Sequence, residues 1–346
     1  MKVALDSQLA LGTATGIGEY VRGLALALRS RGIEVVELAD PSLDPWRFDR
    51  RVRWDQFALP RRARSSRADL LHCASGTMPL SLPLPAVVTV HDVAWLKVQK
   101  HARPYARWYF GPFALGRYRH AAAIAVDSAF SRSELLDVLQ VPEDRVHVVY
   151  PGVAEDFCAL ARRPSADRVV FVPGTVERRK NLEVLIRALP ALPETRIVSV
   201  GPFTPYRDAC AILAESIGVG DRVEFRGYVE RAELLDLYAT SALVAVPSRY
   251  EGFGYAAAQA LCAGTPVIVS GESSLPEVAA NDATVVPAND QDAWQREILA
   301  VLRDRESAES RAQAARGRAI ERFSWDASGA AMQRVYESAL SAPAAQ

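Results

Sequence analysis

At 346 residues the chain is long enough for two domains with their own cores, and 49% hydrophobic with 24% charged residues is an ordinary composition for a globular protein. Because 41 basic residues balance 41 acidic ones, the net charge is zero and gives no indication of a nucleic-acid partner. Residues 1–165 carry 22 Lys and Arg against 17 Asp and Glu, and residues 166–346 carry the opposite excess. A basic first half fits a phosphate-bearing or membrane-surface acceptor, and it fits solvated helix faces equally well.

The four cysteines, Cys73, Cys158, Cys210 and Cys262, are widely spaced, and none forms a Cys-x-x-Cys pair or lies near a group of histidines. This pattern is typical of reduced structural thiols in a cytosolic protein. The N-terminal segment reaches Asp6 after only three apolar residues, and no run approaches the roughly 18 apolar residues of a membrane span. We therefore expect a cytoplasmic protein, with a peripheral contact at the inner face of the membrane as its closest membrane association.

Short apolar runs alternate with helical stretches, which is the rhythm of a parallel sheet with crossover helices. The expected strands of the first half cover residues 3–5, 35–38, 70–72, 86–90, 123–126 and 146–149, and a helix covers residues 19–29. A polar break at residues 161–168 precedes a second series of strands over residues 169–172, 197–200, 223–226, 243–246 and 267–269. A final helix is expected over residues 325–340. We predict an α/β protein with domains over residues 1–162 and 163–324, then a C-terminal helix and a loose tail over residues 325–346.

The segment TGIGEY, residues 15–20, opens the first predicted helix with Gly16 and Gly18. Glycines at a helix start suit an oxyanion, which the free backbone N–H groups bind. As a dinucleotide fingerprint the segment is incomplete, because Val21 occupies the third glycine position of G-x-G-x-x-G. Phosphate binding and a plain tight turn both stay open at this point.

His91 and Asp92 follow the strongly apolar strand predicted over residues 86–90. Parallel sheets bind ligands at the carboxyl ends of their strands, so His91 is a candidate catalytic residue. The alternative is a hydrogen-bonded structural histidine. Asp92 is expected to cap the next turn or to orient its neighbour.

A second polar segment after a predicted strand is DSAFSRSE, residues 127–134. Ser131 and Glu134 have the spacing of a helix capping box. Because capping accounts for Ser131, only Ser128 and Arg132 are kept as candidate functional residues of this segment.

The segment GTVERRKN, residues 174–181, lies between a predicted strand and a helix whose apolar residues share one face. It places three cations at the carboxyl end of a parallel strand, where a diphosphate is the natural partner of Arg179 and Lys180. The alternative interpretation is a solvated basic turn, since charge runs are usually exposed surface.

The most informative stretch is PSRYEGFGYAAAQALCAGTPVI, residues 247–268, which joins a strand end, a glycine-rich turn and a helix. Gly252 and Gly254 let the backbone bend close to a ligand, and the free N–H groups of the following helix would face an anion. Glu251 and Gln259 are eight residues apart, so one lies at the loop mouth and the other about two turns along the helix. The stretch predicts a site for a phosphorylated sugar.

The segments at residues 15–20, 174–181 and 247–268 together resemble the motifs of retaining glycosyltransferases of family 4. The resemblance implies the GT-B fold, which has two facing Rossmann-like domains with parallel sheets and a C-terminal helix that crosses back to the first domain. Where this chain has Gln259, the family usually has a second glutamate that binds the ribose of the nucleotide. A neutral amide gives up a charge-assisted hydrogen bond of roughly 1.5–3 kcal/mol for one of about 1 kcal/mol.

The resemblance also assigns roles to single residues. Glu251 would hold hydroxyls of the donor sugar, and His91 would lie beside the reacting sugar. Arg179 and Lys180 would neutralise the donor diphosphate, so these four are the expected catalytic residues. The donor-binding residues implied by the same matches are Gly16, Gly18, Gly174, Thr175, Arg179, Lys180, Gly227, Tyr228, Ser248, Glu251, Gly252, Phe253, Gly254 and Gln259. The acceptor side would include Asp92, Ser128 and Arg132.

We therefore expect a retaining glycosyltransferase that moves a hexose from a nucleoside-diphosphate sugar to a saccharide or lipid-linked saccharide, in surface polysaccharide or glycoconjugate synthesis. GDP-mannose is the first choice of donor, with UDP- and dTDP-sugars as alternatives. No metal or other cofactor is expected. Asp290 and Asp292 have the spacing of a metal-binding Asp-x-Asp motif, but they open a predicted helix and fit an N-terminal cap.

Two other function classes stay open. An NAD-dependent oxidoreductase fits the alternating α/β pattern with Gly16 and Gly18, and a noncatalytic sugar-nucleotide-binding protein fits Gln259. The basic and aromatic stretches at residues 46–67 and 95–120 fit contact with an anionic membrane, or a long loop and an amphipathic helix that cover the domain. We favour the covering role for both stretches.

Overall fold

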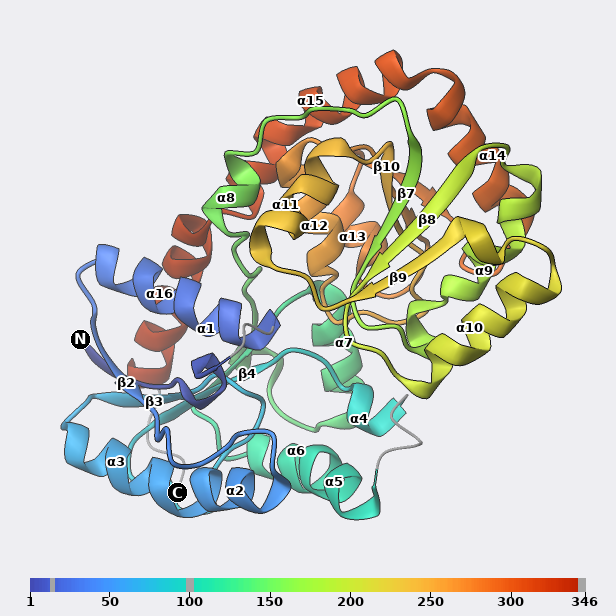
Figure 1. Ribbon diagram of the computed structural model, residues 1–346. Helices are drawn as coiled ribbons and strands as arrows, with labels where there is room; N and C mark the ends of the chain where they lie inside the picture. Colours follow the sequence, from blue (N-terminus) through green and yellow to red (C-terminus); the bar gives the residue numbers. More distant parts are fainter. Residues whose placement is uncertain (13–15, 98–102, 342–346) are drawn as a thin grey trace. The chain divides into compact units, whose positions relative to one another are not determined.

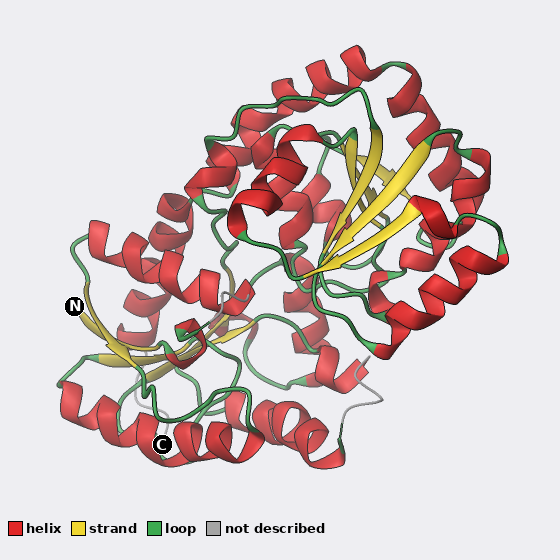
Figure 2. Cartoon of the chain, viewed as in Figure 1, coloured by secondary structure: helices red, strands yellow, loops and turns green. Residues whose placement is uncertain are grey.

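The computed structural model describes residues 1–12, 16–97 and 103–341, and the chain divides into two compact units (Figure 1). Unit 1 comprises Met1–Gly152 together with the C-terminal residues from Ser324, and unit 2 comprises Val153–Phe323. Each unit packs helices against a parallel sheet (Figure 2). The predicted α/β fold of the GT-B class, with its C-terminal helix, is confirmed.

Within its described residues, unit 1 has a six-stranded parallel sheet in the order β2-β1-β3-β4-β5-β6. The strands are β1 (Lys2–Asp6), β2 (Glu34–Leu38), β3 (Leu70–Cys73), β4 (Ala86–Val90), β5 (Ala123–Val126) and β6 (Val146–Val148). Val3 of β1 pairs with Val35 on one side and with Leu70 on the other. Strands β3, β4 and β5 are buried at every residue, as expected for strands covered on both faces. β2 forms one edge of the sheet.

Helices cover both faces of this sheet (Figure 1). They are η1 (Gln8–Ala10), α1 (Gly16–Ser30), α2 (Phe48–Arg53), η2 (Trp54–Ala58), α3 (Leu59–Ser66), α4 (Ala94–Lys97), α5 (Pro104–Trp108), η3 (Tyr109–Phe113), α6 (Ala114–Tyr118), α7 (Ala129–Val138), η4 (Glu143–Arg145) and α16 (Trp325–Ser341). One core joins Ala4 and Leu71 to Trp54 and Leu59, and the other joins Val3 and Leu70 to α1 and α16. Alternate residues of each strand therefore point into opposite cores.

The C-terminal helix α16 packs on α1 because glycines leave room for it. A Cβ at Gly23 would lie 2.1 Å from the ring of Trp325, and one at Gly152 would lie 2.3 Å from the same ring. Further along, a Cβ at Gly329 would lie 3.0 Å from Ala27. The predicted final helix is thus confirmed as part of unit 1; of the tail expected after it, residues 342–346 lie outside the described part of the chain.

Unit 2, whose residues are all described, has a six-stranded parallel sheet in the order β12-β11-β10-β7-β8-β9. The strands are β7 (Arg168–Pro173), β8 (Thr195–Val200), β9 (Val223–Gly227), β10 (Leu243–Val246), β11 (Val267–Ser270) and β12 (Thr284–Val286). Five of these six were predicted. The sequence analysis missed β12, a three-residue edge strand whose central Val285 is exposed, because so short a run carries no periodicity.

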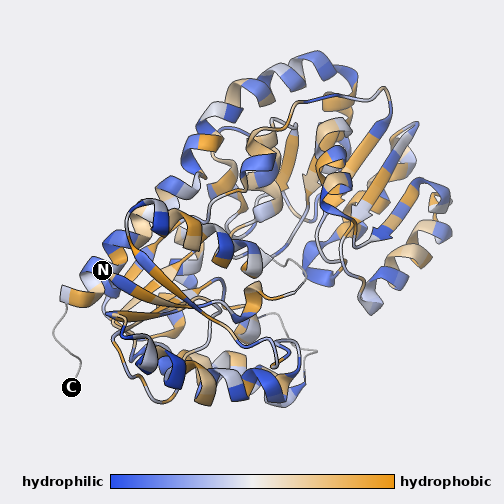
Figure 3. Ribbon diagram, turned by 60° about the vertical axis from the view of Figure 1, so that its left-hand side comes forward, coloured by the Kyte–Doolittle hydropathy of each residue, from blue (hydrophilic) through white to orange (hydrophobic). Residues whose placement is uncertain are grey.

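The helices of unit 2 surround a core that includes Trp294, Leu185 and Ile186. They are α8 (Glu155–Cys158), η5 (Arg178–Lys180), α9 (Leu182–Ala188), η6 (Leu189–Ala191), α10 (Pro205–Ser216), η7 (Gly220–Arg222), α11 (Arg231–Thr240), α12 (Tyr255–Ala263), α13 (Leu275–Ala279), α14 (Gln291–Arg303) and α15 (Arg305–Arg322). Figure 3 shows apolar residues concentrated on the strands and polar ones on the outer helices. Among the residues described, no helix has the length and apolarity needed to cross a bilayer.

The division between the units lies before the polar break that marked it in the sequence. Residues 153–162, assigned to the first domain, pack with unit 2. Phe157 makes an edge-to-face contact with Tyr238, with ring centroids 5.1 Å apart. Arg162 donates to the carbonyls of Ala239 and Ser241, at 2.7 and 2.9 Å. These contacts explain why the segment belongs to unit 2 although it precedes the polar break.

Candidate active site

The loop after β7 packs closely against the end of β8 because both contain a glycine. Gly174 has φ +119°, and its N–H donates to the carbonyl of Val200 at the end of β8, at 2.7 Å. A Cβ at Gly201 would lie 2.3 Å from the Gly174 carbonyl oxygen, so a side chain there would push the two strand ends apart. The loop is therefore held against the carboxyl edge of the sheet, where a Cβ at Gly174 would lie 3.6 Å from Lys180 Nζ.

Asn181, which the sequence analysis did not single out, fixes the end of that loop. It adopts φ 56°, is fully buried, and donates through Nδ2 to the carbonyls of Pro247 at 3.0 Å and Ala288 at 2.8 Å. Asparagine is one of the few residues besides glycine that adopts left-handed backbone angles readily. These bonds tie the basic turn to the end of β10, where the glycine-rich loop begins.

Glu251 binds both cations of the basic turn. Its Oε1 accepts from Lys180 Nζ at 2.6 Å and from Ser248 Oγ at 2.7 Å, and its Oε2 accepts from Arg179 at 3.0 Å. A carboxylate has about four acceptor positions, so these three bonds leave one on Oε2. The structure thus brings together Arg179, Lys180, Ser248 and Glu251, which were predicted from two separate motifs.

Charge compensation keeps Glu251 ionised although its side chain is buried. Burial alone would raise the pKa of Glu251, but the charges of Lys180 and then Arg179 outweigh it and lower the pKa to about 2. Arg179 also forms an ion pair with Glu177 at 2.8 Å. Two cations and two carboxylates thus share one corner of the sheet edge, preorganised for a ligand that carries charge.

Serines after β11 hold the backbone of the glycine-rich loop. The Glu251 N–H donates to Ser273 Oγ at 2.9 Å. Ser274 Oγ donates to the carbonyls of Glu251 at 3.0 Å and Phe253 at 2.7 Å. The sequence analysis missed these supports, and the signal available was the run of small polar residues that follows a predicted strand.

The glycine-rich loop then turns into helix α12. Gly254 has φ +98°, and a Cβ there would lie 2.7 Å from Leu275, so only glycine fits this position. Phe253 is buried against Phe323, with ring centroids 5.5 Å apart, which gives it a packing role. Gly252 is also buried. The loop places the N-terminus of α12 beside Glu251, and the positive end of the helix dipole favours negative charge there.

Gln259 lies two turns along α12 and is half-buried. Its Oε1 accepts from the hydroxyl of Tyr238 at 3.0 Å, which fixes the amide. Gln259 lies in the same unit as Glu251, but within unit 2, all of whose residues are described, the two side chains form no hydrogen bond with each other.

An exposed aromatic surface lies at the end of β9. Gly227 has φ +68° and its carbonyl accepts from the N–H of Gly201 at 2.7 Å. A Cβ at Gly227 would lie 3.3 Å from the ring of Phe203, and Phe203 and Tyr228 are 50% and 59% exposed. Phe203 was not predicted. Two exposed aromatic rings beside the sheet edge form a surface on which a flat base can stack.

In unit 1, His91 is held by two acceptors. Its Nδ1 lies 2.7 Å from Asp127 Oδ2, and its Nε2 lies 3.1 Å from the Ala74 carbonyl oxygen. Burial alone would lower the pKa of His91, but the Asp127 carboxylate outweighs it and raises the pKa above its ordinary value. Asp127 lies at the end of the neighbouring strand β5, and the sequence analysis quoted it without a role. The signal that could have found it is that its strand lies next to β4, which His91 follows.

Buried polar groups continue from His91 toward the C-terminal helix. The Tyr20 ring packs edge-to-face on His91 with centroids 5.0 Å apart, and its hydroxyl lies 3.0 Å from Thr89 Oγ1. Thr89 Oγ1 lies 2.8 Å from His72, whose other ring nitrogen lies 2.7 Å from the Tyr336 hydroxyl. Burial, and secondarily the neighbouring His91, lower the pKa of His72 to about 3, so His72 is neutral.

The glycine segment of unit 1 lies inside a helix. Helix α1 starts at Gly16, so Gly16 and Gly18 occupy its first turn, three residues before the expected start at residue 19. Among the described residues, a Cβ at Gly16 would meet no atom within 4 Å. Thr15, quoted in the same motif, lies outside the described residues.

The acceptor-side candidates have structural roles. Asp92 Oδ1 accepts from the N–H of Ala94 at 2.9 Å, which confirms the expected turn cap. The predicted capping box at Ser131 is wrong, because α7 starts at Ala129 and its N-cap is Ser128, which accepts from the Ser131 N–H at 2.9 Å. Arg132 donates to the Val146 carbonyl at 3.0 Å.

Asp290 caps helix α14, as predicted. Its side chain accepts from the N–H of Ala293 at 2.9 Å. One oxygen of the Asp290 carboxyl group thus caps the helix, and Asp292 lies in the first turn, where its charge interacts favourably with the helix dipole.

The chain matches two family models that between them cover both units. Residues 14–157 match the model described as Glycosyltransferase Family 4, and residues 160–318 match the model described as Glycosyl transferases group 1. It is 34% identical over 286 residues to the D-inositol 3-phosphate glycosyltransferase of Xylanimonas cellulosilytica, an alignment that covers 74% of this chain and 67% of that protein. It is 31% identical over 262 residues to the O-antigen chain mannosyltransferase B of Escherichia coli, covering 70% and 67%.

Solved structures share the fold over nearly the full length. Sucrose-phosphate synthase from Thermosynechococcus elongatus matches with a TM-score of 0.79 at 22% identity, covering 97% of this chain and 98% of that one. HepE of Anabaena, solved in complex with UDP-glucose, matches with a TM-score of 0.73 at 19% identity, covering 98% and 99%. At these identities the likeness concerns the fold.

Proposed function

The chain belongs to the glycosyltransferase family whose two models it matches, and from that premise we propose that it is a retaining, metal-independent enzyme that transfers a hexose from a nucleoside-diphosphate sugar. The acceptor we propose is a saccharide or a lipid-linked saccharide, used in surface polysaccharide or glycoconjugate synthesis. The proposal goes beyond the family in its donor, acceptor, stereochemistry and site residues.

The observation that carries the proposal is the cluster of Arg179, Lys180, Ser248 and Glu251. Two cations at the carboxyl edge of a parallel sheet, beside the N-terminus of α12, favour a diphosphate over a neutral ligand. A guanidinium and an ammonium on one carboxylate also supply their charge without a metal ion. Both cations are already held by Glu251, so little side-chain conformational entropy would be lost when the donor binds.

The reaction starts with the bond between C1 of the hexose and the diphosphate oxygen. As that bond breaks, negative charge grows on the leaving diphosphate, and Arg179, Lys180 and the α12 N-terminus stabilise it. The acceptor hydroxyl attacks C1 from the same face, and its proton passes to the departing phosphate oxygen. The configuration at C1 is thereby retained, and no separate protein base takes part.

Glu251 and His91 position the hexose in this proposal. Glu251 has one acceptor position left on Oε2, which suits one sugar hydroxyl. His91, held by Asp127 and the Ala74 carbonyl, has its ring orientation fixed before substrate binds. Because its orientation is fixed, the side chain can position a sugar ring without losing rotamer entropy on binding.

The donor is proposed from relatives together with the site. The relative from Escherichia coli is named a mannosyltransferase, and a structural neighbour was solved with UDP-glucose. GDP-mannose stays our first choice, with UDP- and dTDP-sugars as alternatives. Phe203 and Tyr228 would stack on the base, and Gln259 would bind the ribose through a neutral hydrogen bond.

A peripheral membrane contact would bring a lipid-linked acceptor to unit 1. Helix α5 has no buried residue, and Tyr105 and Trp108 are 44% and 57% exposed beside Arg103 and Arg107. Exposed aromatic rings flanked by arginines are typical of segments that bind an anionic bilayer surface. We propose this short helix as the membrane contact of a cytoplasmic protein.

The other function classes lose their basis. The NAD-dependent oxidoreductase rested on Gly16 and Gly18, which lie in a segment matched by a glycosyltransferase model. The noncatalytic alternative rested on Gln259, yet the charged cluster around Glu251 is assembled in full.

The experiment that tests the proposal is a ligand panel of GDP-, UDP-, dTDP- and ADP-sugars, measured by thermal shift and calorimetry with and without EDTA. A ligand that binds only the folded state raises the melting temperature. We expect selective stabilisation by one base that EDTA does not alter, followed by sugar transfer from that donor. Stabilisation that disappears with EDTA would overturn metal independence, and no response to any sugar nucleotide would overturn the donor site.

A further inference from the structure

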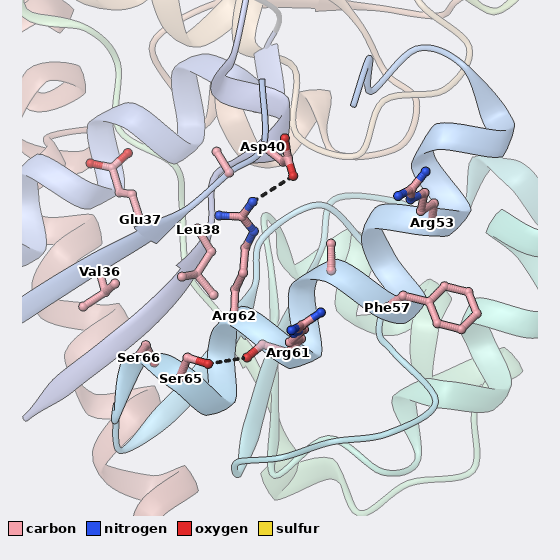
Figure 4. Close-up of a pocket in the computed structure, with 12 residues that line it drawn as sticks. Val36, Glu37, Leu38, Asp40, Arg53, Phe57, Arg61, Arg62, Ser65 and Ser66 are labelled. Atoms are coloured by element: carbon pink, nitrogen blue, oxygen red, sulfur yellow. Dashed lines mark hydrogen bonds and ion pairs between the residues drawn. The ribbon is translucent and has the colours of Figure 1, made fainter. Parts of the chain in front are cut away.

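A groove of about 610 Å³ lies on unit 1, away from the residues discussed so far. One wall is the edge strand β2 with the residues after it, from Val36 to Asp40, and the other is the helical segment from Arg53 to Ser66 (Figure 4). Its volume falls within the range of small-molecule sites, roughly 300–1,000 Å³. Neither wall contributes to the phosphate-binding cluster of unit 2.

Two arginines in this groove lack partners. Arg53 and Arg61 are exposed, and neither makes an ion pair or side-chain hydrogen bond with any residue that the structure describes. By contrast, Arg62 binds Asp40 at 2.8 Å, and Glu37 binds Arg29 at 2.7 Å. The acidic groups of the groove are therefore compensated, and the two positive charges of Arg53 and Arg61 are left for a ligand.

Phe57 lies between these arginines on the same helical segment. Arg53, Phe57 and Arg61 recur every four residues, and Phe57 is 70% exposed within the groove (Figure 4). The segment from Trp54 to Ala58 is a π-helical turn, a feature that is frequent at functional sites. Trp54 anchors that turn by donating from Nε1 to Asp6 at 2.9 Å.

This set of groups matches one ligand chemistry. A guanidinium binds a carboxylate or phosphate through two parallel hydrogen bonds, and an exposed aromatic ring packs on the apolar face of a sugar. Glu37, Asp40 and Ser65 supply oxygens to which sugar hydroxyls can donate. A bilayer surface fits less well, because the groove is concave and a bilayer surface is broad and nearly flat.

We propose that this groove, lined by Arg53, Phe57 and Arg61, binds a saccharide that carries carboxylate or phosphate groups. The site is separate from the donor site, and its occupancy does not depend on the proposed transfer reaction. In a glycosyltransferase, such a groove would hold part of an anionic saccharide chain remote from the reacting hydroxyl.

The test is calorimetry of the full chain without donor, with trigalacturonate as the anionic probe and maltotriose as its uncharged counterpart, at low ionic strength. We expect trigalacturonate to bind, and maltotriose to bind at least about tenfold more weakly. Arg53→Ser and Arg61→Ser should each weaken trigalacturonate binding roughly three- to tenfold, at the low end for charge-assisted contacts because the groove is open to solvent. Phe57→Ser should weaken the binding of both saccharides, since stacking does not depend on charge.

Arg64→Ser is the matched control. Arg64 is exposed on the same helix but does not line the groove, so its loss changes the overall charge equally and should leave binding unchanged. Equal effects of Arg64→Ser and Arg61→Ser would overturn the proposal in favour of a diffuse positive field. Loss of trigalacturonate binding in Arg179→Ala would also overturn it, because the probe would then occupy the donor site. The proposal would also be overturned if the wild-type protein did not bind trigalacturonate and instead bound phosphatidylglycerol vesicles through Arg53 and Arg61.

Discussion

Lys180 and Glu251 are 71 residues apart in the sequence, yet Lys180 Nζ lies 2.6 Å from Glu251 Oε1. The contact exists because β7 and β10 are neighbours in the sheet, so the loops that follow them meet at one edge. The diphosphate and sugar contacts of the proposed site are therefore linked through one ion pair.

Removing either cation should abolish most of the activity. Arg179→Ala or Lys180→Ala takes away charge that stabilises the leaving diphosphate, and we expect kcat to fall about 100- to 1,000-fold with the donor that the ligand panel identifies. Arg178→Ala is the control, because Arg178 only packs over the Tyr206 ring, at 5.4 Å. It should stay within about threefold of wild type. Turnover of Arg179→Ala within a few-fold of wild type would show that the diphosphate binds elsewhere.

The ionisation of Glu251 should make stability depend on pH. Its pKa falls from 4.5 to about 2 on folding, so the stabilisation is complete above pH 4.5 and is lost as the pH falls from 4.5 toward 2. The shift corresponds to about 3 kcal/mol. Urea unfolding of wild type and Glu251→Gln across this range should show a stability difference that shrinks with falling pH. A difference that stays constant with pH would contradict the lowered pKa.

Restoring a carboxylate at position 259 should tighten nucleotide binding. In Gln259→Glu, the Tyr238 hydroxyl can donate to the new carboxylate as it does to the amide oxygen. A ribose hydroxyl would then gain a charge-assisted bond, worth roughly 0.5–2 kcal/mol more than the neutral one, or about 2- to 30-fold in Kd. Calorimetry with the free nucleoside diphosphate measures this. Weaker binding by the glutamate variant would place Gln259 away from the ribose.

Asp127 should set the protonation of His91. The pKa of His91 is raised, so this group stabilises the fold fully below pH 6.5 and the stabilisation is lost as the pH rises through the folded pKa. Asp127→Asn removes the carboxylate and should lower the pKa of His91. An NMR titration of the imidazole resonances checks this, with the buried His72 as an internal reference that stays neutral over the range. An unchanged His91 titration would mean that another group holds its proton.

Adding a methyl group beneath Trp325 should destabilise unit 1. A Cβ in Gly23→Ala would lie 2.1 Å from the indole ring, and such overpacking costs about 1–3 kcal/mol. Gly116→Ala is the control, since it is also helical and its Cβ would meet nothing within 4 Å. It should be neutral or stabilising by up to about 1 kcal/mol. Thermal unfolding of both variants distinguishes packing from helix propensity.

Most of the sheet was readable from the sequence because central parallel strands are continuous apolar runs. β4 and β10 illustrate this, since every residue of each is buried. β12 was missed because an exposed edge strand lacks such a run. The domain division was misplaced because residues 153–162 pack on unit 2 through the Phe157 ring and through bonds from the Arg162 side chain to backbone carbonyls, and the polar break does not reveal such long-range contacts.

Site residues were predicted where a sequence motif contains them. They were missed where their role depends on backbone conformation. Glu251 and Lys180 lie in recognisable motifs, and their contact follows from sheet order. Asn181 acts through a left-handed backbone and two long-range carbonyl bonds, which no spacing reveals. The cap of α7 was assigned to Ser131 instead of Ser128 because two serines three residues apart fit the same local pattern.

Trp325 rests against Gly23 and Gly152, residues that leave the ribosome long before it does. Helix α16 completes the core around β1 and β3, so unit 1 lacks part of its interior until this helix, which follows unit 2 in the chain, has been synthesised. Unit 2 is one uninterrupted segment and has all of its strands earlier. Vectorial synthesis therefore favours the reverse of the usual order, with the middle of the chain consolidated first and the N-terminal unit closed last.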